Sequence, residues 1–479
     1  MANDTPKSHD EKLKRYKTAL HNGKPDCVPI RPFVAEFVAK YAGYTCQEVT
    51  HDYNKAIDAT IQCAADFDWD ATVPNMVYVW TGLTEAVGLK YYGVPGIDIE
   101  EDVGFQYREP AEEDAFMRAD EYDRLIDDPT AFLYEVWFPR VAEDICATGD
   151  PTTYRHSTAL VRSAMAMLQY FMDLGAGAQR MQDETGTVPA IGGILKAPFD
   201  ILADKFRGYY GLTMDMHTQP EKVLAAAEAL APHLLRVAID SADPTGTVPV
   251  AIWMHRGCVP FVTPAQFDSH YWPTLKPIIQ ELWKRDLQTL FYAEGDWNAH
   301  LDSFTELPDR SIVFHVDRAD IFEVYEKLGD KFCISGGIPN FLLSYGSPDE
   351  VRDCCRKIID GVAADGGYIA DAGAIMQDDT CEENLRVMTE FVRDYGTYSS
   401  GGGGNTKDSG ESDGGDEETD SMPLFPDDNS GSPPGTCVPW EKKRSERGPI
   451  TGSEELVERI WQQVDANAYT FIWHWVVSF

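Results

Sequence analysis

The clearest indication of the fold comes from residues 289–337, TLFYAEGDWNAHLDSFTELPDRSIVFHVDRADIFEVYEKLGDKFCISGG. Three short apolar runs, Thr289–Glu294, Ser311–Val316 and Phe332–Gly337, alternate here with segments of helical period such as Ile321–Leu328. Apolar runs that alternate with helices are typical of βα units, in which the strands lie parallel in one sheet.

Five further runs extend this pattern from Cys27 to Gly373: Val28–Val34, Ala71–Tyr78, Ala190–Leu195, Val248–Met254 and Gly367–Gly373. The helices expected between them include Glu221–Ala238, Pro264–Arg285 and Pro348–Ala363. Eight strands separated by helices close most economically into a (β/α)8 TIM barrel, which is the fold we predict. A doubly wound open sheet is the alternative, but no glycine-rich phosphate loop follows the first strand.

Composition divides the chain into three regions. We expect the barrel to span residues 1–398 and a disordered linker rich in Gly, Ser and acidic residues to span 399–452. In 453–479 we expect a short helix, Ser453–Asn467, followed by the aromatic run Tyr469–Phe479. That run is too short to cross a bilayer as a helix, so we expect it to dock on the barrel or on a second subunit. Contact with a membrane surface and a poorly structured end are the alternatives.

The 479-residue chain is 43% hydrophobic and carries a net charge of −38. This charge repels a phosphate backbone, which excludes nucleic acid as a partner, and it fits a saline cytoplasm in which salt screens self-repulsion. We expect a cytoplasmic protein, because the sequence holds neither a transmembrane-length apolar run nor a signal peptide. The ten cysteines form no CxxC pair, which favours buried free thiols.

Polar residues follow most of the expected strands, at the end where barrels of this kind hold their active sites. As catalytic candidates we take Glu294, His255 and Asp371. The candidates for substrate binding are Glu36, Asn75, Lys196, Arg256, Tyr292, Asp317 and Gly337. Carboxylates and histidines that converge at one place can supply a general acid, a general base or metal ligands. Each could instead be an ordinary rim charge paired with an arginine or a helix N-terminus.

His255 and Glu294 are the strongest candidates. Each terminates a strongly apolar run, where an ionisable group is costly unless it is used. Neighbouring strands lie ~4.8 Å apart, so we expect both side chains to face one cavity.

Several motifs give the chain a wider resemblance. They are Ala197–Leu202 with Phe206–Gly208, Met254–Gly257 with Tyr271–Pro273 and Phe291–Gly295, Ile334–Pro339 with Ser347–Val351 and Gly366–Ile369, and Gly23–Pro29. On these motifs the chain resembles the uroporphyrinogen decarboxylase superfamily from Lys12 to Tyr398, near its corrinoid-linked methyltransferase and demethylase branch. The resemblance implies a TIM barrel.

The chain departs from the tetrapyrrole decarboxylases of that superfamily. Their first strand is followed by an Arg-Gln-Ala-Gly-Arg-Tyr signature that holds substrate carboxylates, whereas Arg31 is the only basic residue within Arg31–Glu36. Their second strand is followed by an aspartate that binds pyrrole N–H groups, whereas Val77–Trp80 stands here. A tetrapyrrole would therefore leave pyrrole donors and carboxylates without partners.

It also departs from the zinc-dependent methyltransferases. Their metal is held by His-x-Cys after strand five and by a Cys after strand eight, and the matching positions here are Tyr292, Glu294 and Ala374. A rearranged divalent-metal site, with zinc as the first choice, would use Glu294 and His255, with Asp371 as a further option.

Three functions follow from this comparison. The first is methyl transfer from a small methylated substrate or a methyl-corrinoid partner protein. The second is decarboxylation of a tetrapyrrole or another acid, for which Lys196, Arg207 and Arg256 are the candidate cations. The third is a non-catalytic barrel that binds a corrinoid or tetrapyrrole. No cofactor is firmly indicated by the residues themselves, and a homodimer is compatible with the aromatic C-terminal segment.

Overall fold

The computed structural model describes residues 9–73, 83–86, 88–90, 92–398 and 431–477. Its main feature is a six-stranded parallel sheet in the order β10-β9-β8-β7-β6-β5. The strands are β5 (Gly193–Lys196), β6 (Val250–Met254), β7 (Thr289–Ala293), β8 (Ile312–Val316), β9 (Cys333–Gly336) and β10 (Tyr368–Ile369). Their order follows the chain without a reversal, as in a barrel, and differs from that of a doubly wound sheet.

The two edges of this sheet are linked through shorter pairings. Strand β1 (Ala71–Thr72) pairs in parallel with β4 (Val188–Pro189). Single parallel bridges join Ile30 to Ala370 and Phe33 to Val73. Within the described residues, the expected strand Val28–Val34 therefore takes part only through isolated bridges, and the regular ladder does not form a closed ring. Much of the second expected strand, with Asn75, lies outside the described residues.

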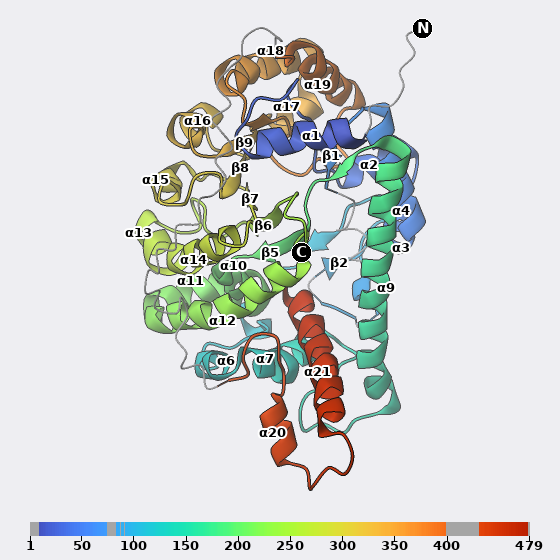
Figure 1. Ribbon diagram of the computed structural model, residues 1–479, viewed down its shortest axis with the longest axis vertical. Coiled ribbons are helices and arrows are strands. Elements are labelled where there is room, and N and C mark those ends of the chain that lie inside the picture. The colour runs from blue at the N-terminus through green and yellow to red at the C-terminus, as the bar shows by residue number, and fades with distance from the viewer. Residues whose placement is uncertain (1–8, 74–82, 87, 91, 399–430, 478–479) are drawn as a thin grey trace.

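Helices cover the outside of the sheet (Figure 1). The α-helices are α1 (His9–Leu20), α2 (Glu36–Ala42), α3 (Cys46–His51), α4 (Tyr53–Asp66), α6 (Tyr122–Asp127), α7 (Pro129–Phe132), α8 (Phe138–Val141), α9 (Tyr154–Thr185), α10 (Pro198–Ile201), α11 (Gly208–Thr218), α12 (Pro220–Ser241), α13 (Pro264–Gln266), α14 (Trp272–Trp283), α15 (Leu301–Phe304), α16 (Ile321–Leu328), α17 (Asn340–Tyr345), α18 (Pro348–Ile358), α19 (Glu382–Tyr395), α20 (Trp440–Ser445) and α21 (Glu454–Val477). The expected helices Glu221–Ala238, Ile321–Leu328 and Pro348–Ala363 are confirmed, the last as α18 with a π-helical end.

Shorter segments complete the list. Four of them are π-helical: η2 (Leu133–Trp137), η3 (Leu202–Arg207), η4 (Phe267–Tyr271) and η6 (Ile359–Ala363). Two are 3-10 helices: η1 (Glu112–Asp114) and η5 (Asn298–His300). A separate antiparallel pair joins β2 (Tyr92–Gly93) to β3 (Gln106–Tyr107).

The core lies between the sheet and its helices. Every residue of β6, β7 and β8 is buried, which explains why these strands are continuous apolar runs rather than alternating ones. Phe291, Phe304 and Phe314 pack together there, with ring centroids 4.7 to 5.4 Å apart. The strands that precede the candidate site are therefore held on both faces.

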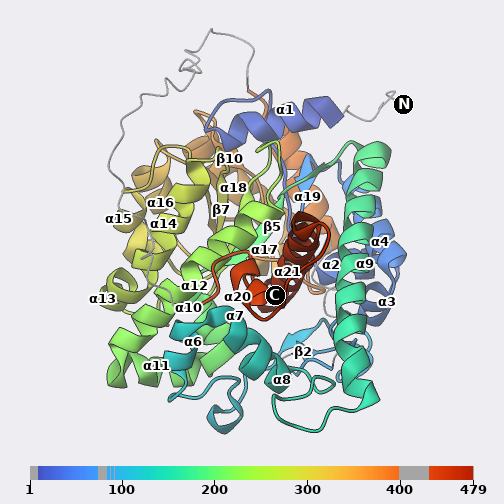
Figure 2. The same cartoon turned by 60° about the horizontal axis from the view of Figure 1, so that its bottom comes forward.

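The C-terminal part differs from the sequence-based expectation. One helix, α21, runs from Glu454 to Val477 and includes the aromatic residues that we expected after a shorter helix. Trp473 and Trp475 are fully buried, and Trp473 stacks on His233 of α12 at 4.6 Å. Residues 431–452, expected to be disordered, belong to the described structure and contain α20, whereas 399–430 lie outside it. Figure 2 shows α21 between α9 and α12.

Across the described ranges, no helix combines the length and the apolar character that crossing a membrane requires.

Candidate functional site

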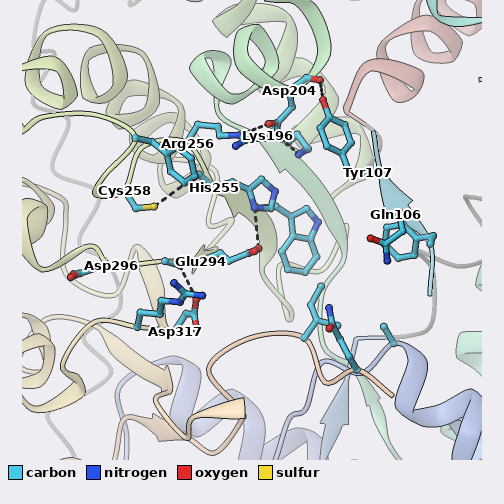
Figure 3. Close-up of a pocket in the computed structure, with 18 of the residues that line it drawn as sticks. Gln106, Tyr107, Lys196, Asp204, His255, Arg256, Cys258, Glu294, Asp296 and Asp317 are labelled. Atoms are coloured by element: carbon cyan, nitrogen blue, oxygen red, sulfur yellow. Dashed lines mark hydrogen bonds and ion pairs between the residues drawn. The ribbon is translucent and has the colours of Figure 1, made fainter. Parts of the chain in front are cut away.

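A cavity of about 830 Å³ opens at the carboxyl ends of β5 to β8 (Figure 3). Six of the residues predicted from the sequence line it: Glu36, Lys196, His255, Arg256, Glu294 and Asp317. Lys196 ends β5, and the others from β6 to β8 stand directly after their strands. The parallel sheet therefore brings these side chains to one place, as parallel strands do at their carboxyl edge.

His255 and Glu294 form a pair inside this cavity. Nδ1 of His255 lies 3.0 Å from Oε2 of Glu294 (Figure 3). Burial favours the neutral form of the Glu294 carboxyl, but His255 and the more distant Lys196 lower its pKa below the usual value. Among the described residues no group is hydrogen-bonded to Nε2 of His255, so this nitrogen is available to a bound molecule.

Asp200 of α10 holds the loop that carries His255. One of its carboxylate oxygens accepts the backbone N–H groups of His255 and Arg256 at 3.0 and 2.9 Å. The other accepts the hydroxyl of Tyr271 at 2.6 Å. Burial, together with the neighbouring Asp204, raises the pKa of Asp200. This carboxyl fixes the direction in which the chain leaves β6, and therefore where the imidazole points.

Asp204 forms ion pairs with two cations on one wall of the cavity. Its carboxylate oxygens lie 2.9 Å from Nζ of Lys196 and 2.8 Å from Nε of Arg256. Burial opposes its charge, but Lys196, His255 and Arg256 lower the pKa of Asp204 far enough to keep it ionised. The π-helical turn η3 places both Asp204 and Lys205 on the cavity, and such turns are frequent at functional sites.

Arg256 is held on three sides. Besides Asp204, its Nη2 lies 3.2 Å from Oε2 of Glu109. Its guanidinium also lies over the ring of Phe261, 5.1 Å from the centroid. A bound carboxylate would have to compete with two acids already in place for this cation.

Asp317 closes the opposite wall. Its Oδ2 accepts the backbone N–H of Gly295 at 2.8 Å. Burial raises the pKa of Asp317 to about 6, against the effect of the Gly295 amide and together with the Glu294 carboxylate. Gly295 has a φ of +98°, and a Cβ there would lie 2.5 Å from Sγ of Cys258. The tight turn that presents Glu294 therefore needs glycine.

Three predicted residues do not line this cavity. Asp371 lies deeper, in the centre of the fold, 3.2 Å from Nη2 of Arg31, and burial raises its pKa to about 7 despite that arginine. Tyr292 is two residues before Glu294 on the same strand face, so it lies one layer lower and stacks on His315 at 4.1 Å. Gly337 lines a separate hollow between α16 and α18. Our prediction that these three belong to one site with His255 differs from the arrangement found.

The remaining lining includes five aromatic residues that were not found from the sequence: Tyr92, Phe105, Tyr107, Trp253 and Phe261. Trp253 forms part of the floor and stacks on Phe33 at 4.8 Å. Tyr92, Phe105 and Tyr107 reach the cavity from the segment around β2 and β3. That segment has no helical or strand period strong enough to place it over the barrel. Asp200 and Asp204 lie within the Ala197–Leu202 motif and its continuation, which was the one available signal.

A rearranged zinc site built on Glu294 and His255 does not fit the arrangement of these residues. Within the described ranges, no group of three His, Cys, Asp or Glu side chains is placed to hold a metal ion. His255 and Glu294 contact each other, and the nearby Cys258 is a poor ligand because burial raises its pKa to about 12. Ala374 supplies no ligand atom where the methyltransferases have a cysteine. No step is therefore assigned to a metal.

A sequential parallel sheet with an ionisable cavity at its carboxyl edge defines an α/β protein of the barrel-enzyme type. The family model for uroporphyrinogen decarboxylase (URO-D) matches residues 140–395, more than half of the chain, and the chain belongs to this family. A methyltransferase from Methanosarcina mazei has a similar fold, with a TM-score of 0.52 and 14% sequence identity. The match covers 80% of this chain and 98% of that one. A search of curated proteins found no match.

Proposed function

We propose that this chain is a methyl-transfer enzyme of the uroporphyrinogen decarboxylase family that acts on a small methylated substrate. The observation that carries the proposal is the His255–Glu294 pair, 3.0 Å apart in a cavity of about 830 Å³. The methyltransferase fold of the Methanosarcina mazei protein supports it at the level of architecture. A corrinoid on a partner protein would supply the methyl acceptor or donor.

The pair is suited to moving a proton at the leaving atom. When a methyl carbon leaves an oxygen or a nitrogen, that atom keeps the bonding electron pair and takes up a proton. His255 can donate this proton from Nε2, while Glu294 accepts the hydrogen bond from Nδ1–H and stabilises the imidazolium. Asp200 fixes the backbone on which the imidazole is carried. The aromatic side chains around Trp253 would give an apolar contact surface to the methyl group of a bound substrate.

The charge of the lining argues against an acidic tetrapyrrole. The cavity is lined by five carboxylates and four cations: Glu36, Asp204, Glu294, Asp296 and Asp317 against Lys196, Lys205, Arg256 and Arg318. Lys196 and Arg256 are already paired with Asp204. A substrate with several carboxylates would have to displace Asp204 from these two cations, so decarboxylation is the second candidate.

The proposed catalytic domain has a defined C-terminal limit. We place the site within a barrel domain that ends at Tyr398, with α21 packed on it as a structural part rather than as a separate domain.

The test is a comparison of two reactions with purified protein. The chain is incubated with methyl ethers, methylamines and methyl thioethers in the presence of cob(I)alamin, and methylcobalamin is followed by its absorbance. A parallel incubation with uroporphyrinogen measures released CO2. We expect methyl transfer from one substrate class and no CO2. Release of CO2 would favour the decarboxylase, and bound cobalamin without turnover would favour the non-catalytic barrel.

A further inference from the structure

Lys205 is a buried lysine of the cavity lining that the proposed methyl transfer does not use. Its residue is 0% exposed, yet it lines the cavity of about 830 Å³ together with Tyr92, Tyr107 and Asp204. A lysine is rarely buried to this degree, because its ammonium group loses its hydration there. A lysine kept at such a place in a cavity is a candidate for a chemical role.

The π-helical turn η3 holds the backbone that carries Lys205. Two successive carbonyl oxygens of this turn accept hydrogen bonds from outside it. The hydroxyl of Tyr107 donates to the carbonyl of Asp204 (Figure 3), and Nε1 of the fully buried Trp137 donates to the carbonyl of Lys205 at 2.8 Å. Both donors come from segments distant in the sequence, so the turn is anchored on either side of the lysine. The side chain of Lys205 therefore starts from a fixed backbone.

The surroundings of Lys205 favour its neutral amine. Burial lowers the pKa of Lys205 well below the usual value, and the nearby Lys196 lowers it further because two positive charges repel each other. Asp204 acts in the opposite direction, but its carboxylate oxygens already lie 2.9 and 2.8 Å from nitrogens of Lys196 and Arg256. By residue type Lys205 counts among the cations of the cavity, whereas these neighbours favour an uncharged nitrogen with a lone pair.

A neutral amine in a cavity is a nucleophile toward a carbonyl carbon. Lysines gain this reactivity when they are desolvated or lie next to another cation, and both conditions hold for Lys205. We propose that the side-chain amine of Lys205 forms a reversible imine with an apolar aldehyde or ketone that binds beside it. This activity is separate from methyl transfer and uses another wall of the same cavity.

The atoms of this reaction balance without a further reactant. The nitrogen lone pair of Lys205 attacks the carbonyl carbon and forms a C–N bond. Both N–H protons pass to the carbonyl oxygen, which leaves as water. The C=O bond is replaced by C=N, and neither partner is oxidised or reduced.

The wall beside Lys205 fits an aromatic carbonyl compound. Nζ of Lys205 lies 5.7 Å from the ring centroid of Tyr92, and the ring of Phe105 packs edge-on against Tyr92 at 5.9 Å. Tyr107 is the register partner of Tyr92 in the β2–β3 pair and lines the same cavity. Aromatic rings pack well against the face or edge of another ring. We therefore expect an aryl aldehyde or ketone to bind here.

A carbonyl compound with an anionic group fits this wall less well. Lys196 and Arg256 both form ion pairs with Asp204, so a carboxylate or phosphate would have to displace Asp204 from them. Glu36 adds another carboxylate to the lining. An uncharged compound meets neither obstacle.

The test is reductive trapping of the imine on the full-length chain. The protein is incubated at pH 7 with benzaldehyde and cyanoborohydride, and peptide mass spectrometry locates the benzyl groups. We expect Lys205 to be labelled about 10-fold or more faster than Lys284, whose side chain is 57% exposed, because only about 0.04% of an ordinary lysine amine is neutral at this pH. The N-terminal amine is also partly neutral, and peptide mapping separates its label from that of Lys205.

A second probe tests the class of carbonyl compound. 4-Formylbenzoate has the same aldehyde and ring as benzaldehyde but carries a carboxylate. The ratio of labelling at Lys205 to labelling at Lys284 should be lower with 4-formylbenzoate than with benzaldehyde. An equal or higher ratio would overturn the assignment to apolar compounds.

Two variants make the assignment specific. Lys205→Met removes the amine and keeps an unbranched apolar side chain, so rapid benzylation outside the N-terminal peptide should disappear. Lys284→Met is the matched control and should keep that rapid benzylation. Equal rates at Lys205 and Lys284 in the parent chain would overturn the proposal, and this comparison needs no variant to fold. Because trapping requires no methyl donor, its result is independent of the proposed methyl transfer.

Discussion

Glu294 is the residue on which the proposed chemistry depends most directly. Its carboxylate is held ionised by His255, with a pKa below the usual value, and it stabilises the imidazolium that forms when His255 takes up a proton. Glu294→Gln keeps the shape of the side chain and removes the charge. We expect turnover or ligand affinity to fall by about 10²-fold or more, while the free energy of unfolding stays within ~1 kcal/mol.

The matched control for this change is Asp296→Asn, at another carboxylate of the same cavity lining. It should leave turnover within a factor of a few. Steady-state kinetics measure the turnover of both variants, and denaturant unfolding measures their stability. Equal activity of Glu294→Gln and the parent chain would make Glu294 an ordinary rim charge.

Asp371 should act on stability rather than on turnover. Burial raises its pKa to about 7, from an ordinary value near 3.8. The folded protein therefore holds a proton that the unfolded chain releases, so the contribution of Asp371 to stability is full below pH 4 and falls as pH rises to 7. Asp371→Asn removes this dependence. The stability of the parent chain relative to the variant should drop by at least ~1 kcal/mol between pH 4 and 7, as measured by urea unfolding. A pH-independent difference would contradict this account.

Some residues of the candidate site could be predicted from the sequence, and others could not. His255 and Glu294 could be predicted because each ends an apolar run, and the strand register then places them together. Asp200 could not, because its partners are backbone N–H groups 55 and 56 residues further along the chain. Asp371 could be assigned to the end of a strand, but not to a depth below the cavity. Depth depends on how the strands are staggered, which sequence patterns do not record.

At the level of elements, α21 is the part that sequence reasoning underestimated. A barrel that ends at Tyr398, as expected from the sequence, would tolerate truncation after that residue with a change of only a few degrees in the unfolding temperature. The helix buries Ile472, Trp473 and Trp475 against α7, α12 and η2. Its removal would expose that surface on the barrel. We now expect the truncated chain to lose much of its soluble yield or to unfold well below the parent, as differential scanning calorimetry would record.

A single substitution tests the same point without truncation. Trp473→Ala should cost about 3–5 kcal/mol of unfolding free energy, because a fully buried indole leaves a cavity when it is removed. Val464→Ala, on the exposed face of the same helix, should cost less than ~0.5 kcal/mol. Equal effects of the two variants would mean that α21 is not part of the core.

The strands were predictable to different degrees for a physical reason. The central strands β6, β7 and β8 are buried on both faces, so their sequences are apolar throughout and their limits agree closely with those expected. Val28–Val34 has apolar residues too, but it forms only isolated bridges with its neighbours. Apolar periodicity reports burial and not the completeness of a hydrogen-bond ladder.

For the whole molecule, the charge of −38 makes stability depend on salt. Repulsion among the excess carboxylates acts against the compact state, and added ions screen it. We expect the unfolding temperature to be several degrees higher at a molar concentration of NaCl than at a low concentration. An equal osmolality of sucrose serves as the uncharged control. A fall in the unfolding temperature with NaCl would mean that attractive ion pairs outweigh the repulsion.

The most direct test of the proposed methyl transfer compares the His255→Gln variant with the parent chain. The substrates belong to the class, among methyl ethers, methylamines and methyl thioethers, that the parent chain demethylates. The measurement is the rate of methyl transfer for a series of these substrates whose leaving atoms differ in basicity. If His255 protonates the leaving atom, the loss of rate in the variant should grow with that basicity and reach about 10²-fold for the most basic leaving atom. A loss of the same size for every member of the series, or no loss at all, would contradict the assignment of His255 and Glu294 as the proton-transfer pair.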